Sequence, residues 1–475
     1  MRAKRRTPWR DNLEAAAGAI VLAVLFKYFL LEFYRIPSGS MQPTLYGTGA
    51  PLELYDRVIA DKLSFRLREP ERFEVVIFRY PLDRSKNFVK RLVGLPGEEL
   101  KLENGDVWVR ADESDSWRIP RRPAGVMQGQ WRRLACDRAG VRWRVEGLRG
   151  ADAPAWRAEG DAILARGAGA LRYVAQGEGP IRDVYADGYP PAVAARLAVP
   201  PRTGANAVGD LRLSAEVVAL PGCESVAFEL EEGALLHRFV LPGPAAVADA
   251  RPRLESVPRP GRRAGGEPRS ATADAAWRLP AGRALRVTAQ NLDDRLTLAL
   301  DGEVVLELEV EPVAWQDSGL RVEVEGEGAR LADLEVARDV YYTQGTDPGP
   351  WRIPEGRYFM LGDNTQDSSD SRDWARVTVA WDGEQASGNA RPERMDGPVL
   401  GDTNPVRVRA GASAGLTFLR DEWGEGHVFP TAAEQGPQQL APDPFVPREL
   451  ITGRALASLW PISPGLGVWR PKWIR

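Results

Sequence analysis

The chain contains very little histidine and cysteine. Only two histidines, His237 and His427, and two cysteines, Cys136 and Cys223, occur among its 475 residues. The cysteines are far apart and form no CxxC or metal-ligand spacing, so whether they pair outside the cell stays open. We expect no metal and no cofactor, because the histidine and cysteine clusters that hold catalytic metals are missing.

The chain also has no strong net charge of either sign. The formal net charge is -3, and no basic stripe runs along the chain, so we expect no nucleic-acid partner. Lysine is uncommon, with 7 residues against 56 arginines. The position of each lysine is therefore informative.

The N-terminal region combines a basic start with a long apolar run. Residues 1–12 carry five basic residues against one acid, and residues 15–34 read AAAGAIVLAVLFKYFLLEFY, with Lys27 and Glu32 as the only charges. That run has about the ~20 residues needed to cross a bilayer. The basic flank predicts a cytoplasmic tail, a transmembrane helix over 13–34 and an exported remainder.

A cleaved signal peptide is the alternative for this region. Cleavage would require a small-x-small site after the apolar run, but Phe33, Tyr34, Ile36 and Pro37 stand there instead. We therefore expect an uncleaved anchor, with the chain in the cell membrane and its remainder on the outer side.

The exported part has the pattern of β-strands. ELKLENGDVWVR, residues 99–110, alternates on both sides of Asn104-Gly105, which predicts a hairpin with a type I′ turn. RLTLALDGEVVLELEV, residues 295–310, alternates in the same way around Asp301-Gly302. No long amphipathic helix follows the apolar run, so the fold is predicted to be mainly β and antiparallel, with a sandwich in its middle part.

Three short stretches could carry chemistry. They are RIPSGSMQPTL (35–45), NFVKRLVGLPGEEL (87–100) with Lys90 among apolar residues, and the polar loop in YFMLGDNTQDSSDSRDW (358–374). Taken singly, they could be an exit loop, a lysine that reaches solvent and a turn. A calcium loop is a weak alternative for the third stretch, because the EF-hand spacing is absent.

Taken together, the three stretches favour serine nucleophilic chemistry. A serine nucleophile needs a base, and neither histidine lies near these stretches in sequence. A lysine can act as the base when apolar surroundings favour its neutral form, which suits Lys90. The turn Ser38-Gly39-Ser40 can direct a hydroxyl and a backbone N–H to one point, as an oxyanion hole requires.

The same stretches, in this order and behind an N-terminal apolar run, resemble bacterial signal peptidase I (leader peptidase). PSGSMQPTL, VKRLVGLPGEEL and GDNTQDSSDSR are similar to its serine, lysine and GDN boxes. DRVIADKLSF with FEVVIFRYP, and VPRELITGRA near the C-terminus, resemble further strands of that family. The resemblance covers about residues 8–110, 341–377 and 446–475.

This resemblance implies a division of the chain into seven parts. They are a basic tail (1–12), an anchor (13–34), an antiparallel β catalytic core (35–110, 341–377 and 446–475), a β-rich insertion (111–340) and a second insertion (378–445). Within the first insertion we expect a sandwich over about 155–339, similar to a concanavalin-type jelly roll on its hairpin pattern alone.

The resemblance also implies roles for individual residues. Ser40 matches the nucleophile, Lys90 the general base, and Ser38 the hydroxyl that joins the Ser40 N–H in the oxyanion hole. Ser368 matches the serine that orients the lysine. The remaining matches are supporting salt-bridge residues and two positions in the pockets for small side chains: Asp363, Asp370, Arg91 and Arg372 in the first group, Ile36 and Val89 in the second.

Two departures from the family pattern stand out. The arginine that follows GDN in the family is Thr365 here, and Gln366 and Asp367 come next, so the charge pattern of the loop differs. The two insertions are also far larger than in a minimal member. Neither departure removes a catalytic position.

The function implied is a membrane-bound endopeptidase that cuts signal peptides from exported preproteins after small-x-small motifs, with the lipid bilayer as a second partner. One alternative is another Ser–Lys peptidase of the self-cleaving repressor type, although no DNA-binding helix is indicated. The other is a non-enzymatic surface protein whose sandwich contacts carbohydrate or protein.

Overall fold

The computed structural model describes residues 8–48, 52–134, 142–146, 156–175, 179–197, 204–262, 267–313, 317–345, 348–390, 404–408 and 413–474. The protein is mainly β, as predicted. It divides into two compact units. Unit 1 comprises Met1–Lys101, Val107–Gly129 and Gln344–Arg475, and unit 2 comprises Leu102–Asp106 and Gln130–Thr343.

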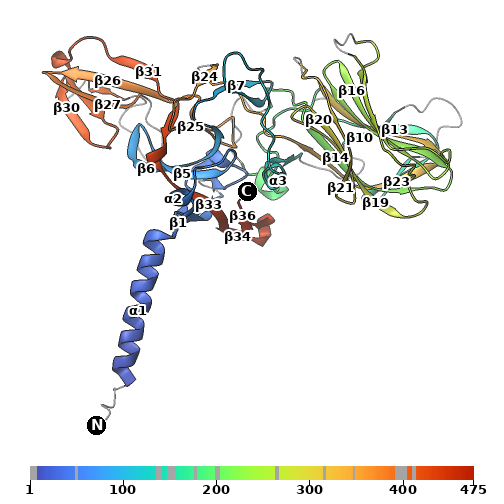
Figure 1. Ribbon diagram of the computed structural model, residues 1–475, viewed down its shortest axis with the longest axis horizontal. Coiled ribbons are helices and arrows are strands. Elements are labelled where there is room, and N and C mark those ends of the chain that lie inside the picture. The colour runs from blue at the N-terminus through green and yellow to red at the C-terminus, as the bar shows by residue number, and fades with distance from the viewer. Residues whose placement is uncertain are drawn as a thin grey trace. The chain divides into compact units, whose positions relative to one another are not determined.

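The helix at the start of the chain differs from the expected anchor. Helix α1 spans Pro8–Phe29, and strand β1 (Leu31–Arg35) follows almost at once (Figure 1). The prediction of one helix over 13–34 is therefore wrong at its C-terminal end. Within the described residues, we find no helix whose length and apolar character would let it cross a membrane.

Pairing with a neighbouring strand explains this early end. β1 lies antiparallel to β4 (Arg57–Asp61), with Leu31 opposite Asp61 and Arg35 opposite Arg57. The β1 backbone groups thus bond to a sheet and cannot continue a helix. Glu32, expected inside the apolar span, instead forms an ion pair with Lys62 at 3.2 Å.

Unit 1 is built on an eight-stranded antiparallel sheet. Its order is β1-β4-β33-β5-β6-β25-β32, with β36 paired to β33. Strands far apart in the sequence therefore lie side by side, which brings the serine, lysine and GDN stretches together. The further bounds are β5 Val75–Tyr80, β6 Asp83–Gly94, β25 Arg357–Leu361, β32 Phe445–Pro447, β33 Ile451–Trp460 and β36 Lys472–Trp473.

Short elements complete this unit, although residues 102–106 at the turn between β7 and β8, and Gln130 at the end of α3, belong to unit 2. Hairpin β7–β8 turns at Asn104 and Gly105, whose φ angles of 54° and 96° confirm the predicted positive-φ turn. The other bounds are η1 Gly39–Met41, β2 Gly47–Thr48, β3 Leu54–Tyr55, α2 Ser64–Leu67, β7 Glu99–Glu103, β8 Asp106–Arg110, α3 Ala124–Gln130, β24 Trp351–Arg352, η4 Arg448–Leu450, β34 Ile462–Ser463, η5 Pro464–Leu466 and β35 Val468–Trp469.

The second insertion is more regular than its sequence indicated. It forms two three-stranded sheets, β27-β26-β31 and β28-β29-β30, around a core that includes Val379, Trp381, Leu419 and Phe429. In the sequence this stretch shows little regular pattern, because its strands are short and contain few apolar residues that share one small core. The bounds are β26 Ala375–Trp381, β27 Glu384–Asn389, β28 Val406–Val408, β29 Leu416–Arg420, β30 Gly426–Pro430, η3 Thr431–Ala433 and β31 Gln439–Pro442.

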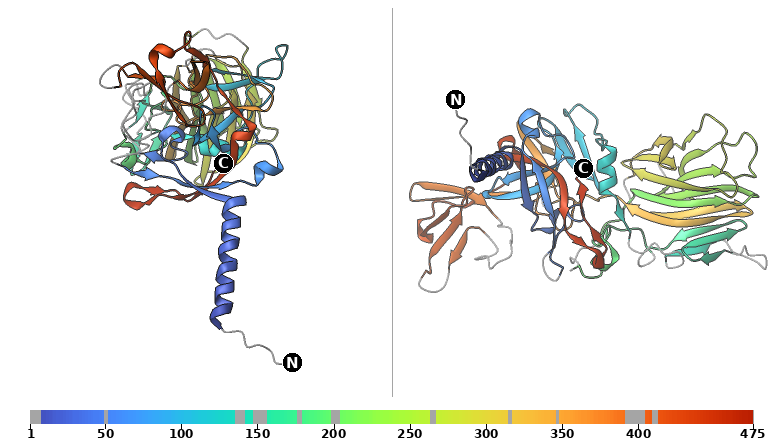
Figure 2. Two further views of the ribbon diagram at one scale, coloured as in Figure 1. Left: turned by 90° about the vertical axis from the view of Figure 1, so that its left-hand side faces the viewer. Right: turned by 90° about the horizontal axis from the view of Figure 1, so that it is seen from below.

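Unit 2 is a sandwich of two antiparallel sheets that lie face to face (Figure 2). One sheet has the order β10-β13-β22-β15-β16-β17-β18, and the other β11-β12-β23-β14-β19-β20-β21, with β9 paired to β23. Apolar side chains from both sheets, among them Phe228, Phe239, Leu298 and Val336, form one core. This core is what joins the two layers.

The strands of the sandwich begin before residue 155, where we expected it to start, because β9 and β10 also belong to it. The hairpin β20–β21 turns at Asp301-Gly302 as predicted. The bounds are β9 Arg132–Arg133, β10 Trp143–Glu146, β11 Arg157–Glu159, β12 Ala162–Arg166, β13 Gly169–Tyr173, α4 Pro191–Ala194, β14 Leu211–Ala219, β15 Cys223–Glu232, β16 Leu235–Pro242, β17 Arg253–Pro258, β18 Arg269–Thr272, β19 Ala284–Leu292, β20 Arg295–Leu300, β21 Glu303–Glu309, β22 Ser318–Gly326 and β23 Gly328–Arg338.

Candidate functional site

The two predicted serines lie on the short loop that follows β1. Ser38 is extended, with φ -113° and ψ 155°, and directly precedes the 3₁₀ turn η1, which contains Ser40. Ser40 is buried, with 7% of its surface exposed. Gly47 lets the chain pass close to the backbone of Ser38, because a Cβ at position 47 would lie 2.1 Å from the Ser38 carbonyl oxygen.

The GDN loop holds the serine loop through Asn364. The Asn364 backbone N–H donates to the Ser40 carbonyl at 3.0 Å, and its side-chain Nδ2 donates to the Gly39 carbonyl at 2.9 Å. Asn364 belongs to the GDN motif, but the sequence does not indicate these contacts. These two hydrogen bonds fix the backbone on either side of the Ser40 nitrogen.

Arg470 supports the other end of the serine loop. Its guanidinium donates to Asp56 at 2.8 Å and to the Thr44 carbonyl, and it lies 4.1 Å from the centre of the Tyr46 ring. Asp56 is fully buried and also accepts from the Tyr46 N–H at 2.7 Å. This contact could not be predicted from the sequence, because only folding brings Arg470 next to Asp56.

Lys90 is a buried lysine in the middle of β6. Its side chain is only 2% exposed, and its Nζ donates to Ser368 Oγ at 3.0 Å. The ammonium also lies 5.7 Å from the centre of the Phe88 ring. The predicted pair of Lys90 and Ser368 is thus brought together across 278 residues of sequence.

A narrow cleft joins the serine loop to β6. Its volume is about 50 Å³. Five of the ten site residues predicted from sequence line it: Ser38, Ser40, Lys90, Ile36 and Val89. The other lining residues are Tyr34, Arg35, Pro37, Ile77, Asn87 and Phe88. Apolar residues, two serines and one lysine therefore line the same small space.

Two buried ion pairs connect the GDN loop to the sheet and to itself. Arg91 binds Asp363 at 2.8 and 2.7 Å, with neither side chain exposed. Arg372 donates to both carboxylate oxygens of Asp370 at 2.7 Å, through Nε and Nη2. Burial alone would raise the pKa of Asp370, but the charge and hydrogen bonds of Arg372 hold this pKa below its ordinary value.

Thr44 and Gly362 bring the GDN loop against the serine loop. Thr44 Oγ1 donates to Asp363 Oδ2 at 2.5 Å. Gly362 touches the site directly, because a Cβ there would lie 2.1 Å from Ser368 Oγ and 2.4 Å from the Ser40 carbonyl oxygen. Only a residue without a side chain fits this position.

The two histidines make other contacts. His237 is buried in unit 2 and lies 3.1 Å from both Glu232 and Ser256. His427, in the second insertion, lies 2.8 Å from Asp421. Neither histidine is among the residues that line the cleft.

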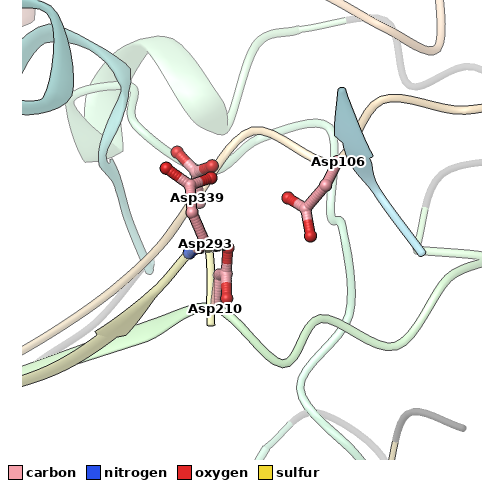
Figure 3. Close-up of side chains that lie close together, drawn as sticks. All are labelled: Asp106, Asp210, Asp293 and Asp339. Carbon is pink, nitrogen blue, oxygen red and sulfur yellow. Dashed lines mark hydrogen bonds between the residues drawn. The ribbon is translucent and has the colours of Figure 1, made fainter. Parts of the chain in front are cut away.

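A second group of titratable residues lies in unit 2 (Figure 3). The carboxylates of Asp106, Asp210, Asp293 and Asp339 all lie within 4.8 Å of one another. Burial, followed by the three neighbouring aspartates and Glu232, raises the pKa of Asp210 well above its ordinary value. Oxygen ligands at this spacing could hold a divalent cation, but acidic clusters also occur without one, and we assign no ion.

The aspartate cluster had no signal in the sequence. Its members are separated by tens to more than a hundred residues. Asp210, Asp293 and Asp339 meet because they flank neighbouring ends of the paired strands β14, β19 and β23, and Asp106 comes from the start of β8 in another sheet. We had expected no metal site, and no ligand-spacing motif would have indicated this cluster.

Comparison with known proteins points to one family. The sequence profile of "Signal peptidase, peptidase S26" matches residues 9–127 and 311–388. The probable signal peptidase I-2 of Synechocystis sp. is 38% identical over 122 residues, which is 24% of this chain and 52% of that protein. Signal peptidase I of Pseudomonas fluorescens is 34% identical over 94 residues, 17% of this chain and 31% of that protein.

Structural comparison adds a more distant likeness. A carbohydrate-binding module from Bacillus subtilis aligns with 40% of this chain and 92% of that module, at 10% identity and a TM-score of 0.24. A score this low supports no conclusion about ligands. The chain spans about half or less of the length of the curated relatives named above. The serine, lysine and GDN stretches all lie within the residues that match the signal peptidase, peptidase S26, profile.

Proposed function

We propose that this protein is a membrane-associated serine endopeptidase that removes signal peptides from exported preproteins after small-x-small motifs. In this proposal Ser40 is the nucleophile and Lys90 the general base. The observation that carries the proposal is the cleft that Ser38, Ser40 and the buried Lys90 all line.

The proposed reaction follows from these positions. Neutral Lys90 takes the Ser40 hydroxyl proton as Ser40 Oγ attacks the scissile carbonyl. The Ser38 hydroxyl and the Ser40 N–H donate to the developing oxyanion. Lys90 then gives the proton to the leaving amine, and afterwards activates the water that releases the acyl-enzyme.

The remaining site residues support this chemistry. Ser368 accepts a hydrogen bond from Lys90 and so directs the amine, while Asn364 holds the backbone beside Ser40. Both hydrogen bonds place the reacting groups before substrate arrives, which lowers the entropic cost of the reaction.

The cleft also supports a preference for small side chains. Ile36, Ile77 and Val89 give it an apolar wall, and its volume is about 50 Å³. A methyl group or hydrogen of a substrate fits such a space, whereas a long or branched side chain does not. Alanine, glycine and serine before the cut are the residues expected.

Site-directed variants of the full chain test the proposal. We expect Ser40→Ala and Lys90→Ala each to lower cleavage of a preprotein with an Ala-x-Ala site by at least about 10³-fold. Ser369→Ala and Lys86→Ala are matched controls, because Ser369 neighbours Ser368 and Lys86 lies on β6, bound to Asp83 at 3.1 Å. Undiminished cleavage by either of the first two variants would reject the proposed dyad.

Attachment to a membrane is part of the proposal. Four exposed apolar residues lie together on the C-terminal strands of unit 1 or beside them: Leu459, Trp460, Trp469 and Trp473. Exposed tryptophans of this kind favour the interface between water and lipid. On α1, Leu13, Ile20 and Val21 are exposed as well.

Vesicle flotation tests this attachment. We expect the protein to float with phosphatidylethanolamine–phosphatidylglycerol vesicles, and Trp469→Ser together with Trp473→Ser to weaken flotation. The single crossing with residues 1–12 in the cytoplasm and the catalytic unit outside stays a prediction. Protease added to intact spheroplasts would digest unit 1 if it lies outside.

The alternatives from the sequence stay predictions too. A self-cleaving repressor-type peptidase would cut its own chain, so intact protein after incubation at alkaline pH would reject it. Carbohydrate contact through unit 2 would give specific signals for the full chain on a glycan array, and a blank array would reject it.

A further inference from the structure

The GDN loop places three aspartates near Lys90, and their charges are balanced differently. Asp363 is bound to Arg91, and Asp370 to Arg372, each through two hydrogen bonds. Each of these carboxylates therefore has its own guanidinium, so its field on neighbouring groups is largely cancelled.

Asp367 has no such partner among the described residues. Its carboxylate takes part in no hydrogen bond or ion pair there, and its backbone N–H donates to the Asn364 carbonyl at 3.1 Å. Asp367 directly precedes Ser368, whose hydroxyl accepts from Lys90 Nζ at 3.0 Å. The unbalanced carboxylate thus sits one residue from the hydrogen-bond partner of the lysine.

Electrostatics connects Asp367 to Lys90. Partial burial raises the pKa of Asp367, and the nearby positive charge of Lys90 is the one resolved influence that lowers it. The interaction is reciprocal, because a carboxylate that is stabilised by an ammonium stabilises that ammonium to the same extent. Asp367 lies at the exposed surface of the loop, so solvent reduces the effect without removing it.

We propose that Asp367 is a positioning residue for the charge of Lys90, and that it sets the pH range in which Lys90 can act as a base. This inference rests on the proposed function. Among the described residues, the next residue on β6 and the GDN loop also carry two neutralised pairs, Arg91–Asp363 and Asp370–Arg372. Asp370 also interacts with Lys90, but Arg372 balances its charge, so Asp367 contributes the unbalanced negative charge.

The carboxylate has two opposite effects on the reaction. Before reaction it favours the ammonium form, so fewer molecules hold the neutral base at low pH. When Lys90 takes the Ser40 proton, the same carboxylate stabilises the ammonium that forms. Asp367 therefore makes Lys90 a stronger base that is available only at higher pH.

These two effects predict that the pH profiles of kcat/KM for Asp367→Asn and for the wild type cross. With Asp367→Asn, we expect the acidic limb of kcat/KM to move down by about 0.5 pH unit, an estimate for a solvent-screened charge. The variant should be about two-fold faster than the wild type below the limb and about two-fold slower on the plateau. Damage to the fold would lower the rate at every pH and could not produce a crossing.

Two variants serve as controls. Asp367→Glu keeps the charge and should keep the wild-type limb. Asp382→Asn removes an equal charge from the turn between β26 and β27, where the positive φ of 44° suits asparagine, and should shift nothing.

Lys90 can also be titrated without any peptidase assay. Trace acetylation with acetic anhydride, read by peptide mass spectrometry across pH, gives the midpoint of the Lys90 amine, with Lys86 as an internal reference. We expect a lower midpoint in Asp367→Asn than in the wild type, and an unchanged midpoint would overturn the inference. If that midpoint moves while the wild type cleaves no preprotein, the inference holds and the proposed function fails.

Discussion

Arg91 and Asp363 form a two-point ion pair at 2.8 and 2.7 Å in which neither side chain is exposed to solvent. Arg91 is the neighbour of Lys90 on β6, and Asp363 belongs to the GDN loop. Thr44 Oγ1 also donates to Asp363, so one carboxylate connects the lysine strand, the GDN loop and the serine loop.

Removal of one partner from this pair should be costly. Asp363→Ala leaves the Arg91 guanidinium buried without its counter-charge, and we expect unit 1 to lose about 3–5 kcal/mol of stability. Hydrogen exchange of β6 peptides in increasing urea measures this loss. Glu71→Ala is the control, because the Glu71 side chain is 72% exposed and its 3.6 Å pair with Arg68 should contribute only about 0–1 kcal/mol.

Gly362→Ala should abolish cleavage while leaving most of unit 1 folded. The added methyl group would lie 2.1 Å from Ser368 Oγ and 2.4 Å from the Ser40 carbonyl, so it must push apart the groups that orient Lys90 and Ser40. We expect kcat to fall by at least about 10²-fold, as for other displacements near 1 Å. Gly465→Ala, with nothing within 4 Å of its new Cβ, should retain full activity.

Lys90→Arg should be as inactive as Lys90→Ala. Arginine keeps the positive charge and much of the length, but it cannot be deprotonated in a protein and so cannot accept the Ser40 proton. Single-turnover cleavage of a labelled preprotein measures the loss. Activity in Lys90→Arg that rises with pH would show that another group is the base.

Asp210 predicts a pH dependence for the stability of unit 2. Its pKa in the fold is raised well above 3.8, so as pH rises past that ordinary value the unfolded chain ionises first and stability is lost. Asp210→Asn removes this loss. In buffer with EDTA, we expect the variant to melt at a higher temperature than the wild type at pH 7, and at nearly the same temperature at pH 3.5; a lower Tm at pH 7 would contradict this.

Cys223 should be unreactive in the native protein. It is fully buried on β15, and burial raises the pKa of its thiol to about 11, so almost no thiolate exists at pH 8. Iodoacetamide should label the Cys223 peptide only after urea is added. Rapid labelling of this peptide in the native protein would show that the strand opens.

The serine and lysine positions could be predicted because their chemistry is local. Lys90 stands out as a rare lysine within an apolar stretch, and Ser38-Gly39-Ser40 is a turn with two hydroxyls. The structure places all three in one cleft. Hairpins around Asn104-Gly105 and Asp301-Gly302 were predictable for the same reason, since two adjacent residues determine the turn.

Features that depend on long-range contacts could not be predicted. The apolar run gave no sign that its helix stops at Phe29, because the stop depends on pairing with β4. Asn364 and Arg470 act through backbone carbonyls of the serine loop, and such acceptors carry no sequence signal. The residues that support the serine loop can therefore be identified only in the folded structure.

The contact between Arg470 and Asp56 has a consequence for the timing of biosynthesis. The two residues are separated by 414 positions, and Ser458 on β33 also binds Asp56, across 402 positions. A nascent chain leaving the ribosome therefore carries Ser40 long before its loop gains this support. The serine loop therefore gains its full support only after Arg470 has been synthesised.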